Sequence, residues 1–484
     1  MLLSIDAGTT STRALAFAPD GRIVASAQHP LTQHFPAPGW VEHDASEIRD
    51  RTLAAVSEVL AKVGDIAAIG ITNQRETAIA WDRETGAPLA PAIVWQDRRT
   101  ADRCAALKAE GHEAAVQAAT GLLLDPYFSA TKFEWLLRES KPVREAADRG
   151  RLCLGTVDTF LLFHLTRGEV FATDVTNASR TLLMDLVSGS WRADLLQLFG
   201  IPQEALPQIR PSIAPFGMAQ VDGRRIPVTG MAGDQQAAAI GQACLSQGEA
   251  KCTYGTGIFL LAATGQRLPA SRNRLVATRA ADAGTFALEG SVFVGGDAVK
   301  WLRDRLAIIE TAAETQALAA SVPDSGGVTL VPAFAGLGAP WWEPRATGLL
   351  TGLTGATTRA HIVRATLEAM GNQTADLIEA FARDGVRPAS LKVDGGMVAN
   401  DWLCQDVADA TGLEVVRPET VETTALGAAM LAAVGCGLFA DLSGAARAMV
   451  RTDRAFLPDP DGRRRAARRA GWLRAIEQVR AGLR

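Results

Sequence analysis

Short apolar runs that end at glycine or at small polar residues recur along the chain. The first covers Leu2 to Ile5, and a second, Arg13 to Ala18, follows a turn of glycine and hydroxyl residues. A third, Ile23 to Ala27, comes after Pro19-Asp20-Gly21. Runs of this length between such turns are typical of β-strands. The pattern predicts a three-stranded meander at the start of the chain.

The same pattern returns near the middle of the sequence. Residues 248–261 again suggest a strand, a turn of glycine and threonine, and a second strand. This repetition predicts that the second half restarts the plan of the first. At 484 residues the chain exceeds the size at which one hydrophobic core usually stops growing. We therefore expect two domains, residues 1–243 and residues 244–484.

Other segments extend the α/β pattern. Residues 66–72 and 77–81 are expected to form a strand pair around Asn73-Gln74-Arg75-Glu76, and residues 361–383 a long amphipathic helix. The uncharged stretch from Thr423 to Ala440 approaches the length of a membrane span, but it is rich in alanine and glycine. A helix packed inside an α/β domain explains this stretch better than insertion into a membrane.

One junction between a strand and a helix carries an acidic residue. Residues 226–233 form a β-type run that ends at glycine, Asp234 follows at once, and an alanine-rich helical pattern begins behind it. Asp234 should therefore lie at the carboxyl end of a strand, where open α/β sheets bind ligands. We interpret Asp234 as the reacting carboxylate. The alternative is that it only caps the helix that starts at Gln235, since aspartate is common at that position.

Two other places carry candidate chemistry. After Asp6, residues 7–12 offer glycine and hydroxyl donors that can surround a phosphate, and Asp6 could hold a hydrated magnesium ion. An ordinary hairpin is the alternative there. The adjacent Arg75 and Glu76 could present a donor and an acceptor to a hydroxylated substrate, with Trp95 as an apolar wall. They could instead form a solvated ion pair that contributes little.

Composition narrows the class of partner. With 49 basic and 53 acidic residues and a net charge of −4, nothing favours nucleic acid or an anionic membrane as the main partner. The six cysteines include no C-x-x-C pair, so neither a zinc site nor a disulfide framework is indicated. Reduced thiols and an N-terminus without signal-peptide features favour the cytoplasm.

The arginine-rich segment 463–469 is expected to be a solvated helix face, with a partner site as the alternative.

Several motifs together resemble a known family. They include Asp6-Ala7-Gly8-Thr9-Thr10-Ser11-Thr12-Arg13, Gly233-Asp234-Gln235-Gln236, Thr253-Tyr254-Gly255-Thr256-Gly257 and Asp394-Gly395-Gly396. In this order, and with the segments 127–136 and 348–368, they resemble the FGGY family of carbohydrate kinases over nearly the whole chain. The resemblance implies an α/β fold of two duplicated actin-like (ribonuclease H-like) domains with a nucleotide cleft between them. The first domain would carry the polyol site and the catalytic aspartate, and the second most of the nucleotide site.

The closest resemblance within the family is to members that phosphorylate glycerol. It implies in-line transfer of the γ-phosphate of ATP to glycerol with Mg²⁺, giving sn-glycerol 3-phosphate. It also implies assembly as a homodimer or homotetramer. The chemistry agrees, because phosphoryl transfer needs mainly positioning, neutralisation of charge and one carboxylate that orients the nucleophile.

The resemblance assigns roles residue by residue. Asp234 would be the general base, and Asp6 and Asp234 would hold Mg²⁺. The glycerol-binding set would be Arg75, Glu76, Trp95, Tyr127, Asp234, Gln235 and Phe259. The nucleotide-binding set would be Thr9, Thr10, Ser11, Arg13, Thr256, Gly257, Gly296, Lys300, Gly396 and Asn400. Lys300 and Ala7 stand where related kinases usually carry glutamine, so the chain departs from the family pattern at these two nucleotide positions.

Two other functions compete with this interpretation. A kinase of the same family could act on another small polyol or a ketose, although larger sugars need more room and more polar partners than Arg75, Glu76, Trp95, Tyr127 and Phe259 offer. An actin-like ATPase would use ATP for conformational change and would need no such pocket. A dinucleotide-binding or P-loop enzyme is disfavoured, because neither glycine-rich motif is present.

Overall fold

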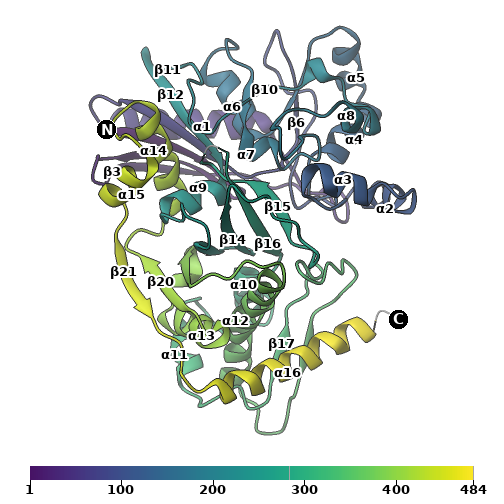
Figure 1. The fold of residues 1–484 in the computed structure, drawn as a ribbon, viewed down its shortest axis with the longest axis vertical. Coiled ribbons are helices and arrows are strands. Elements are labelled where there is room, and N and C mark those ends of the chain that lie inside the picture. The colour runs from purple at the N-terminus through teal and green to yellow at the C-terminus, as the bar shows by residue number, and fades with distance from the viewer. Residues whose placement is uncertain (283, 483–484) are drawn as a thin grey trace.

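The computed structural model describes residues 1–282 and 284–482, which form two α/β units, each built on one large sheet (Figure 1). The described strands of the first sheet have the order β11-β12-β5-β1-β2-β3. Their bounds are β1 Leu2–Ala7, β2 Ser11–Phe17, β3 Ile23–Pro30, β5 Ala68–Asn73, β11 Met218–Val221 and β12 Arg224–Gly233. The second sheet has the order β15-β16-β14-β13-β19-β20-β21. Its strands are β13 Ala250–Tyr254, β14 Ile258–Gly265, β15 Val276–Arg279, β16 Phe286–Val292, β19 Ser390–Asp394, β20 Glu414–Pro418 and β21 Thr452–Phe456.

The two sheets share one topology. In the first, β1 pairs antiparallel with β2 and parallel with β5, β2 pairs antiparallel with β3, and β5 pairs parallel with β12. In the second, β13, β14, β16, β19 and β20 repeat this pattern in the places of β1, β2, β3, β5 and β12. The predicted meander and the predicted restart of the plan in the second half are therefore confirmed.

Within residues 1–282 and 284–482, helices and four short strand pairs surround the sheets. In the first half the helices are α1 Ala45–Leu60, α2 Ala101–Ala109, α3 Glu113–Thr120, α4 Ala130–Glu139, α5 Lys141–Asp148, α6 Val157–Leu165, α7 Val175–Ala178, α8 Ala193–Leu198 and α9 Asp234–Gly241. In the second half they are α10 Gly296–Asp304, α11 Glu314–Ala320, α12 Arg359–Arg383, α13 Asp401–Thr411, α14 Thr423–Gly435, α15 Leu442–Met449 and α16 Gly462–Ala481. The short pairs are β4 Glu42–His43 with β7 Ala92–Ile93, β6 Ile79–Asp82 with β8 Leu152–Gly155, β9 Ala172–Asp174 with β10 Gln208–Arg210, and β17 Thr329–Val331 with β18 Leu349–Thr351.

Helix α14 comes from the second half of the sequence but packs on the first sheet and on α9. In Figure 1, α14 and α15 lie beside the purple strands near the N-terminus. Side chains from both halves share this core, among them Leu2, Phe17, Leu426 and Leu442. The prediction that residues 423–440 contain a buried helix is confirmed. Within the described residues no helix is both long and apolar enough to cross a membrane.

The expected strand pair around residues 73–76 is wrong. Strand β5 pairs with β1 on one edge and with β12 on the other, both parallel, so it has no free edge. The next strand, β6, leaves the sheet and pairs antiparallel with β8. The connection between β5 and β6 contains Glu76 at φ 60°, a backbone conformation that glutamate adopts only when its surroundings hold it there. The connection is thus a constrained turn.

A buried carboxyl near the start of α6 predicts a pH-dependent stability. Burial and the neighbouring Asp174 raise the pKa of Asp158 to about 6 from its ordinary 3.8, although Thr156 and Thr173 donate hydrogen bonds to it. Between these pH values the folded state binds more protons than the unfolded state, so the stability of the wild type falls as the pH rises through this window. Asp158→Asn abolishes this loss.

We expect the melting temperature of Asp158→Asn to exceed that of the wild type at pH 8, with an advantage only about a third as large at pH 4.5, where most of the wild-type carboxyl in the folded state is still protonated. The gain at pH 8 is at most about 3 kcal/mol, because one pKa unit corresponds to about 1.4 kcal/mol. Thermal unfolding of both proteins at several pH values measures it. Because Asp174 also titrates in this region, the decisive quantity is the difference between variant and wild type. A difference that does not change with pH would contradict the prediction.

Candidate functional site

Three parallel strands of the first sheet end at the same edge. In the register of the sheet, Asp6 lies beside Thr72, and Asn73 lies beside Gly233. The chain therefore presents Asp6, the turn after β5 and Asp234 at the carboxyl ends of neighbouring strands, where α/β sheets bind ligands. This is the edge on which the sequence placed its candidate residues.

Asp234 is the first residue of α9, and Gly233 occupies the N-cap position. Its Oδ1 accepts a hydrogen bond from the backbone N of Gln235 at 2.7 Å and lies 3.1 Å from Nε of Arg75. Burial raises the pKa of the Asp234 carboxyl, while Arg75 and Lys251 act to lower it. The result is a carboxylate held in place beside a fixed cation.

Arg75 also lies at the centre of a buried ion network. Its Nη1 donates to Oε2 of Glu289 at 2.6 Å, and its Nη2 donates to Oε1 of the same residue at 3.1 Å. Arg180 donates from Nη2 to Glu289 at 2.9 Å and from Nε to Oε1 of Glu76 at 2.6 Å. Arg75 and Glu76 are therefore buried, and the alternative interpretation of the sequence, a solvated ion pair, is wrong.

An aromatic wall closes one side of this site. The ring of Trp95 lies 5.7 Å from that of Tyr127 and 6.0 Å from that of Phe259, both edge-on. Tyr127 also accepts a 3.5 Å hydrogen bond from Nη2 of Arg75. Trp95 donates from Nε1 to Oγ1 of Thr9 at 2.9 Å. The structure thus brings the candidate polyol residues together and joins them to the first Gly/Thr turn.

That first turn connects β1 and β2 and contains Thr9 and Thr10, and Ser11 follows it as the first residue of β2. Arg13, on β2, donates to both Asp6 and Glu422, so the second half of the chain also contacts this strand. Burial raises the pKa of Asp6, and Arg13 opposes that rise.

The carboxylates Asp6 and Asp234 suit magnesium. Among the described residues no three His, Cys, Asp or Glu side chains are grouped as a preformed metal site. Mg²⁺ usually needs only one or two carboxylates, because waters and substrate phosphates supply its remaining ligands. Two carboxylates at one sheet edge beside a turn of glycine and hydroxyl residues match that donor set.

The second Gly/Thr turn connects β13 and β14 and meets two other glycine segments. The backbone N of Gly295 donates to Thr256 O at 2.7 Å, and Gly296 N donates to Gly255 O at 2.8 Å. Gly395 has φ 92°, and a Cβ there would lie 2.5 Å from Tyr254 O, so only glycine fits. Thr256, Gly257, Gly296 and Gly396 therefore belong to converging segments at one edge of the second sheet.

Two predicted nucleotide residues have other partners. Lys300 forms an ion pair with Asp297 on the exposed face of α10, with Nζ and Oδ1 2.9 Å apart. Asn400 caps α13 by accepting from Leu403 N at 3.0 Å and donates to Thr315 at 3.1 Å. The partners of these two side chains are therefore not Asp6, Asp234 or the ion network around Arg75.

Four buried charged residues at the site were not predicted from the sequence: Arg180, Glu289, Lys251 and Lys132. Lys251 donates to Oε1 of Gln235 and, at 2.8 Å, to Thr253. Lys132 donates to Tyr127 O at 2.6 Å and Glu76 O at 3.3 Å, and burial lowers its pKa to about 7. Glu289 and Lys251 lie in apolar strands, where a charged residue is rare unless it is paired. A charged residue inside an apolar run was therefore the sequence signal that could have identified Glu289 and Lys251.

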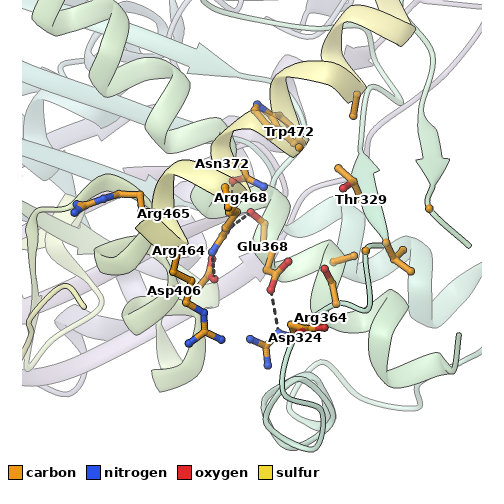
Figure 2. A pocket seen from close by; sticks show the side chains of 18 of the residues that line it. Asp324, Thr329, Arg364, Glu368, Asn372, Asp406, Arg464, Arg465, Arg468 and Trp472 are labelled. Carbon is orange, nitrogen blue, oxygen red and sulfur yellow. Dashed lines mark hydrogen bonds and ion pairs between the residues drawn. The ribbon is translucent and has the colours of Figure 1, made fainter. Parts of the chain in front are cut away.

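A cavity of about 630 Å³ lies elsewhere, between α16 and the helices α12 and α13 (Figure 2). No residue predicted for the site lines it. Arg468 on α16 donates to both carboxylate oxygens of Asp406, and Arg469 donates to Glu379. The expected solvated face is therefore wrong for these two arginines, which hold α16 against the second unit. Arg463 and Arg464 are exposed as expected.

Comparison with known proteins gives full-length matches. The profile of the FGGY family of carbohydrate kinases, N-terminal domain, matches residues 1–241, and that of the C-terminal domain matches residues 250–436. The glycerol kinase of Rhodospirillum rubrum is 52% identical over 496 residues, covering 100% of this chain and 99% of that protein. The glycerol kinase of Alcanivorax borkumensis is 52% identical over 488 residues, covering 99% and 98%. A crystal structure of Plasmodium falciparum glycerol kinase with ADP superimposes with a TM-score of 0.91 at 36% identity, covering 99% and 98%.

Proposed function

This chain belongs to the FGGY family of carbohydrate kinases, as its motifs indicated, and on that premise we propose that it is a glycerol kinase. It transfers the γ-phosphate of ATP to glycerol and releases ADP and sn-glycerol 3-phosphate. The observation that carries the proposal is the carboxylate of Asp234, which is accessible where those of Glu76 and Glu289 are not, and which is held 3.1 Å from Arg75 beside the aromatic wall. Full-length identity of 52% to glycerol kinases supports glycerol as the acceptor.

Accessibility selects the base among the carboxylates of the network. The side chain of Asp234 is 32% exposed, whereas that of Glu76 is 2% exposed and that of Glu289 is 0% exposed. A general base must reach the proton that it takes. Asp234 therefore accepts the proton of the attacking hydroxyl, and its raised pKa brings it closer to the neutral pH at which a base works best.

Glycerol has three hydroxyls on a three-carbon chain, and the site offers a polar surface for the hydroxyls and an apolar surface for the carbons. Arg75, Glu76, Tyr127 and Gln235 supply donors and acceptors for the hydroxyls. Trp95 and Phe259 supply the apolar face against which the carbon chain packs. Because Lys251 can only donate, its bond to Oε1 of Gln235 leaves Nε2 of that amide free to donate to a hydroxyl.

The nucleotide is assigned to the edges of the two sheets. Thr9 and Thr10 on the first turn, Ser11 and Arg13 at the start of β2, and Thr256 and Gly257 on the second turn bind its phosphates through backbone, hydroxyl and guanidinium donors. Gly296 and Gly396 lie by the nucleoside because they allow close backbone approach. Lys300 and Asn400 belong to the same region. They bind the nucleotide once Lys300 leaves Asp297 and Asn400 leaves Thr315 and Leu403. Asp6 and Asp234 hold Mg²⁺, which neutralises phosphate charge when bound.

The function is tested by ADP release from Mg·ATP with purified protein, alone and with glycerol, dihydroxyacetone, erythritol, D-xylulose or D-ribulose. We expect strong stimulation by glycerol, with glycerol 3-phosphate as the product. Stimulation only by a larger sugar would retain the kinase chemistry but overturn the assignment of the pocket. ATP turnover that no acceptor changes would favour an actin-like ATPase.

The cellular setting is part of the proposal. ATP as the phosphoryl donor supports a cytoplasmic location, and the free cysteines, five of them buried, suit a reducing compartment. We also propose assembly as a homodimer or homotetramer, which light scattering coupled to size-exclusion chromatography would measure.

A further inference from the structure

Glu289 links the second sheet to the polyol site. It lies on β16, and its carboxylate accepts two hydrogen bonds from Arg75, at 2.6 and 3.1 Å, and one from Arg180, at 2.9 Å. Both arginines come from the first half of the chain, 214 and 109 residues away in sequence. Ser291 adds a fourth donor at 3.1 Å. One side chain of the second sheet thus fixes two cations of the first half.

These contacts divide the guanidinium of Arg75 into two edges. The edge formed by Nη1 and Nη2 is occupied by Glu289. The Nε group faces Asp234 at 3.1 Å but forms no hydrogen bond, although it is buried. Because the guanidinium is planar and rigid, fixing one edge fixes the direction of the other. Glu289 therefore determines which Arg75 donor faces the accessible part of the site.

Arg180 holds the side chain of Glu76 in place, as Glu289 holds that of Arg75. It bridges Glu289 and Glu76, and it is fully buried. The backbone of Glu76, in its unfavourable conformation, is held by Ser129 and Lys132, which both donate to its carbonyl oxygen. Side chain and backbone of Glu76 are thus fixed by separate partners.

Stability alone gives a weak reason to retain such a network. Taking charged groups out of water costs several kcal/mol per ion, and buried ion pairs are often no more stabilising than well-packed apolar residues. The network lies directly behind the two residues that meet glycerol in the function proposed above. Orientation of those residues before substrate binds is a role that apolar residues could not fill.

We propose that Glu289 and Arg180 are positioning residues for glycerol: Glu289 orients Arg75, and Arg180 orients Glu76, so that both meet the substrate in a fixed geometry. Neither touches the reacting atoms. The inference rests on the proposed function and adds to it that the second sheet supplies part of the rigidity of the polyol site.

The test is Glu289→Gln, which keeps the size of the side chain and removes its charge. We expect kcat/KM for glycerol to fall about 100-fold, the loss typical of a small misplacement of a binding group. The KM for glycerol should rise, while the KM for Mg·ATP and the affinity for ADP stay unchanged. Glu289→Asp, which restores the charge with a shorter reach, should give an intermediate kcat/KM. That split between the two substrates would not follow from a general loss of stability.

The matched control is Asp406→Asn, which removes the charge of another buried carboxylate that pairs with an arginine, Arg468 on α16 (Figure 2). It should lower the melting temperature but leave both KM values as in the wild type. If Glu289→Gln does not fold, Glu289→Asp carries the test through its KM for glycerol.

Two outcomes would overturn the inference in distinguishable ways. If the wild type phosphorylates glycerol and Glu289→Gln has the same kcat/KM for glycerol, the positioning role is removed and the proposed function stands. Where only Glu289→Asp folds, an unchanged kcat/KM in that variant has the same meaning. A wild-type protein that phosphorylates none of the offered acceptors would remove both.

Discussion

Asp234→Asn is expected to fold normally and to lose between about 100-fold and 10,000-fold in kcat with glycerol and Mg·ATP, the contribution of a well-placed general base. The amide has nearly the same shape as the carboxylate and can still accept from Gln235 N, but it cannot take the proton of the attacking hydroxyl. Steady-state kinetics measure the loss. The melting temperature and calorimetric binding of ADP show whether the fold and the nucleotide site survive.

The matched control for this variant is Asp441→Asn. Asp441 caps α15 by accepting from Gly444 N, and asparagine is an equally good N-cap, so the same change of charge should leave turnover unaltered. Near wild-type turnover in Asp234→Asn would exclude Asp234 as the base. Loss of ADP binding together with turnover would instead indicate that its main role is in the nucleotide and magnesium site.

Gly427→Ala is expected to destabilise the protein by about 3 kcal/mol, at the upper end of the usual cost of overpacking. A Cβ on Gly427 would lie 1.8 Å from the carbonyl oxygen of Ala237, and one on Gly241 would lie 1.9 Å from that of Thr423. Since the obstructing atoms belong to the backbone, α9 and α14 can make room only by moving apart. Chemical denaturation followed by tryptophan fluorescence measures the change. Turnover should fall as well, because α9 begins with Asp234.

Gly471→Ala is the matched control. Gly471 lies inside α16, where a Cβ would meet nothing closer than 3.9 Å, so the same substitution should be neutral or stabilise the helix by up to about 1 kcal/mol. Equal stability of Gly427→Ala and the wild type would show that α9 and α14 can separate without cost.

The sequence determined the local features of this protein. Apolar runs separated by glycine turns predicted β1, β2 and β3, and their return after residue 248 predicted the duplicated plan, because these patterns depend on neighbours a few residues apart. The placement of Asp234 after a strand and before a helix followed from the same local information. The resemblance of the motifs then supplied the family.

The tertiary structure decided which distant residues meet. The expected hairpin after β5 failed because β12, more than 150 residues later, occupies the edge that β6 would have needed. Arg75 and Glu289 are 214 residues apart, so no spacing in the sequence could pair them. The crossing of α9 and α14 likewise joins the two halves: the alanine- and glycine-rich composition predicted a packed helix within residues 423–440, but it did not show that α9 is the partner. Periodicity reports which face of an element is buried, but only the packed fold sets what each face contacts.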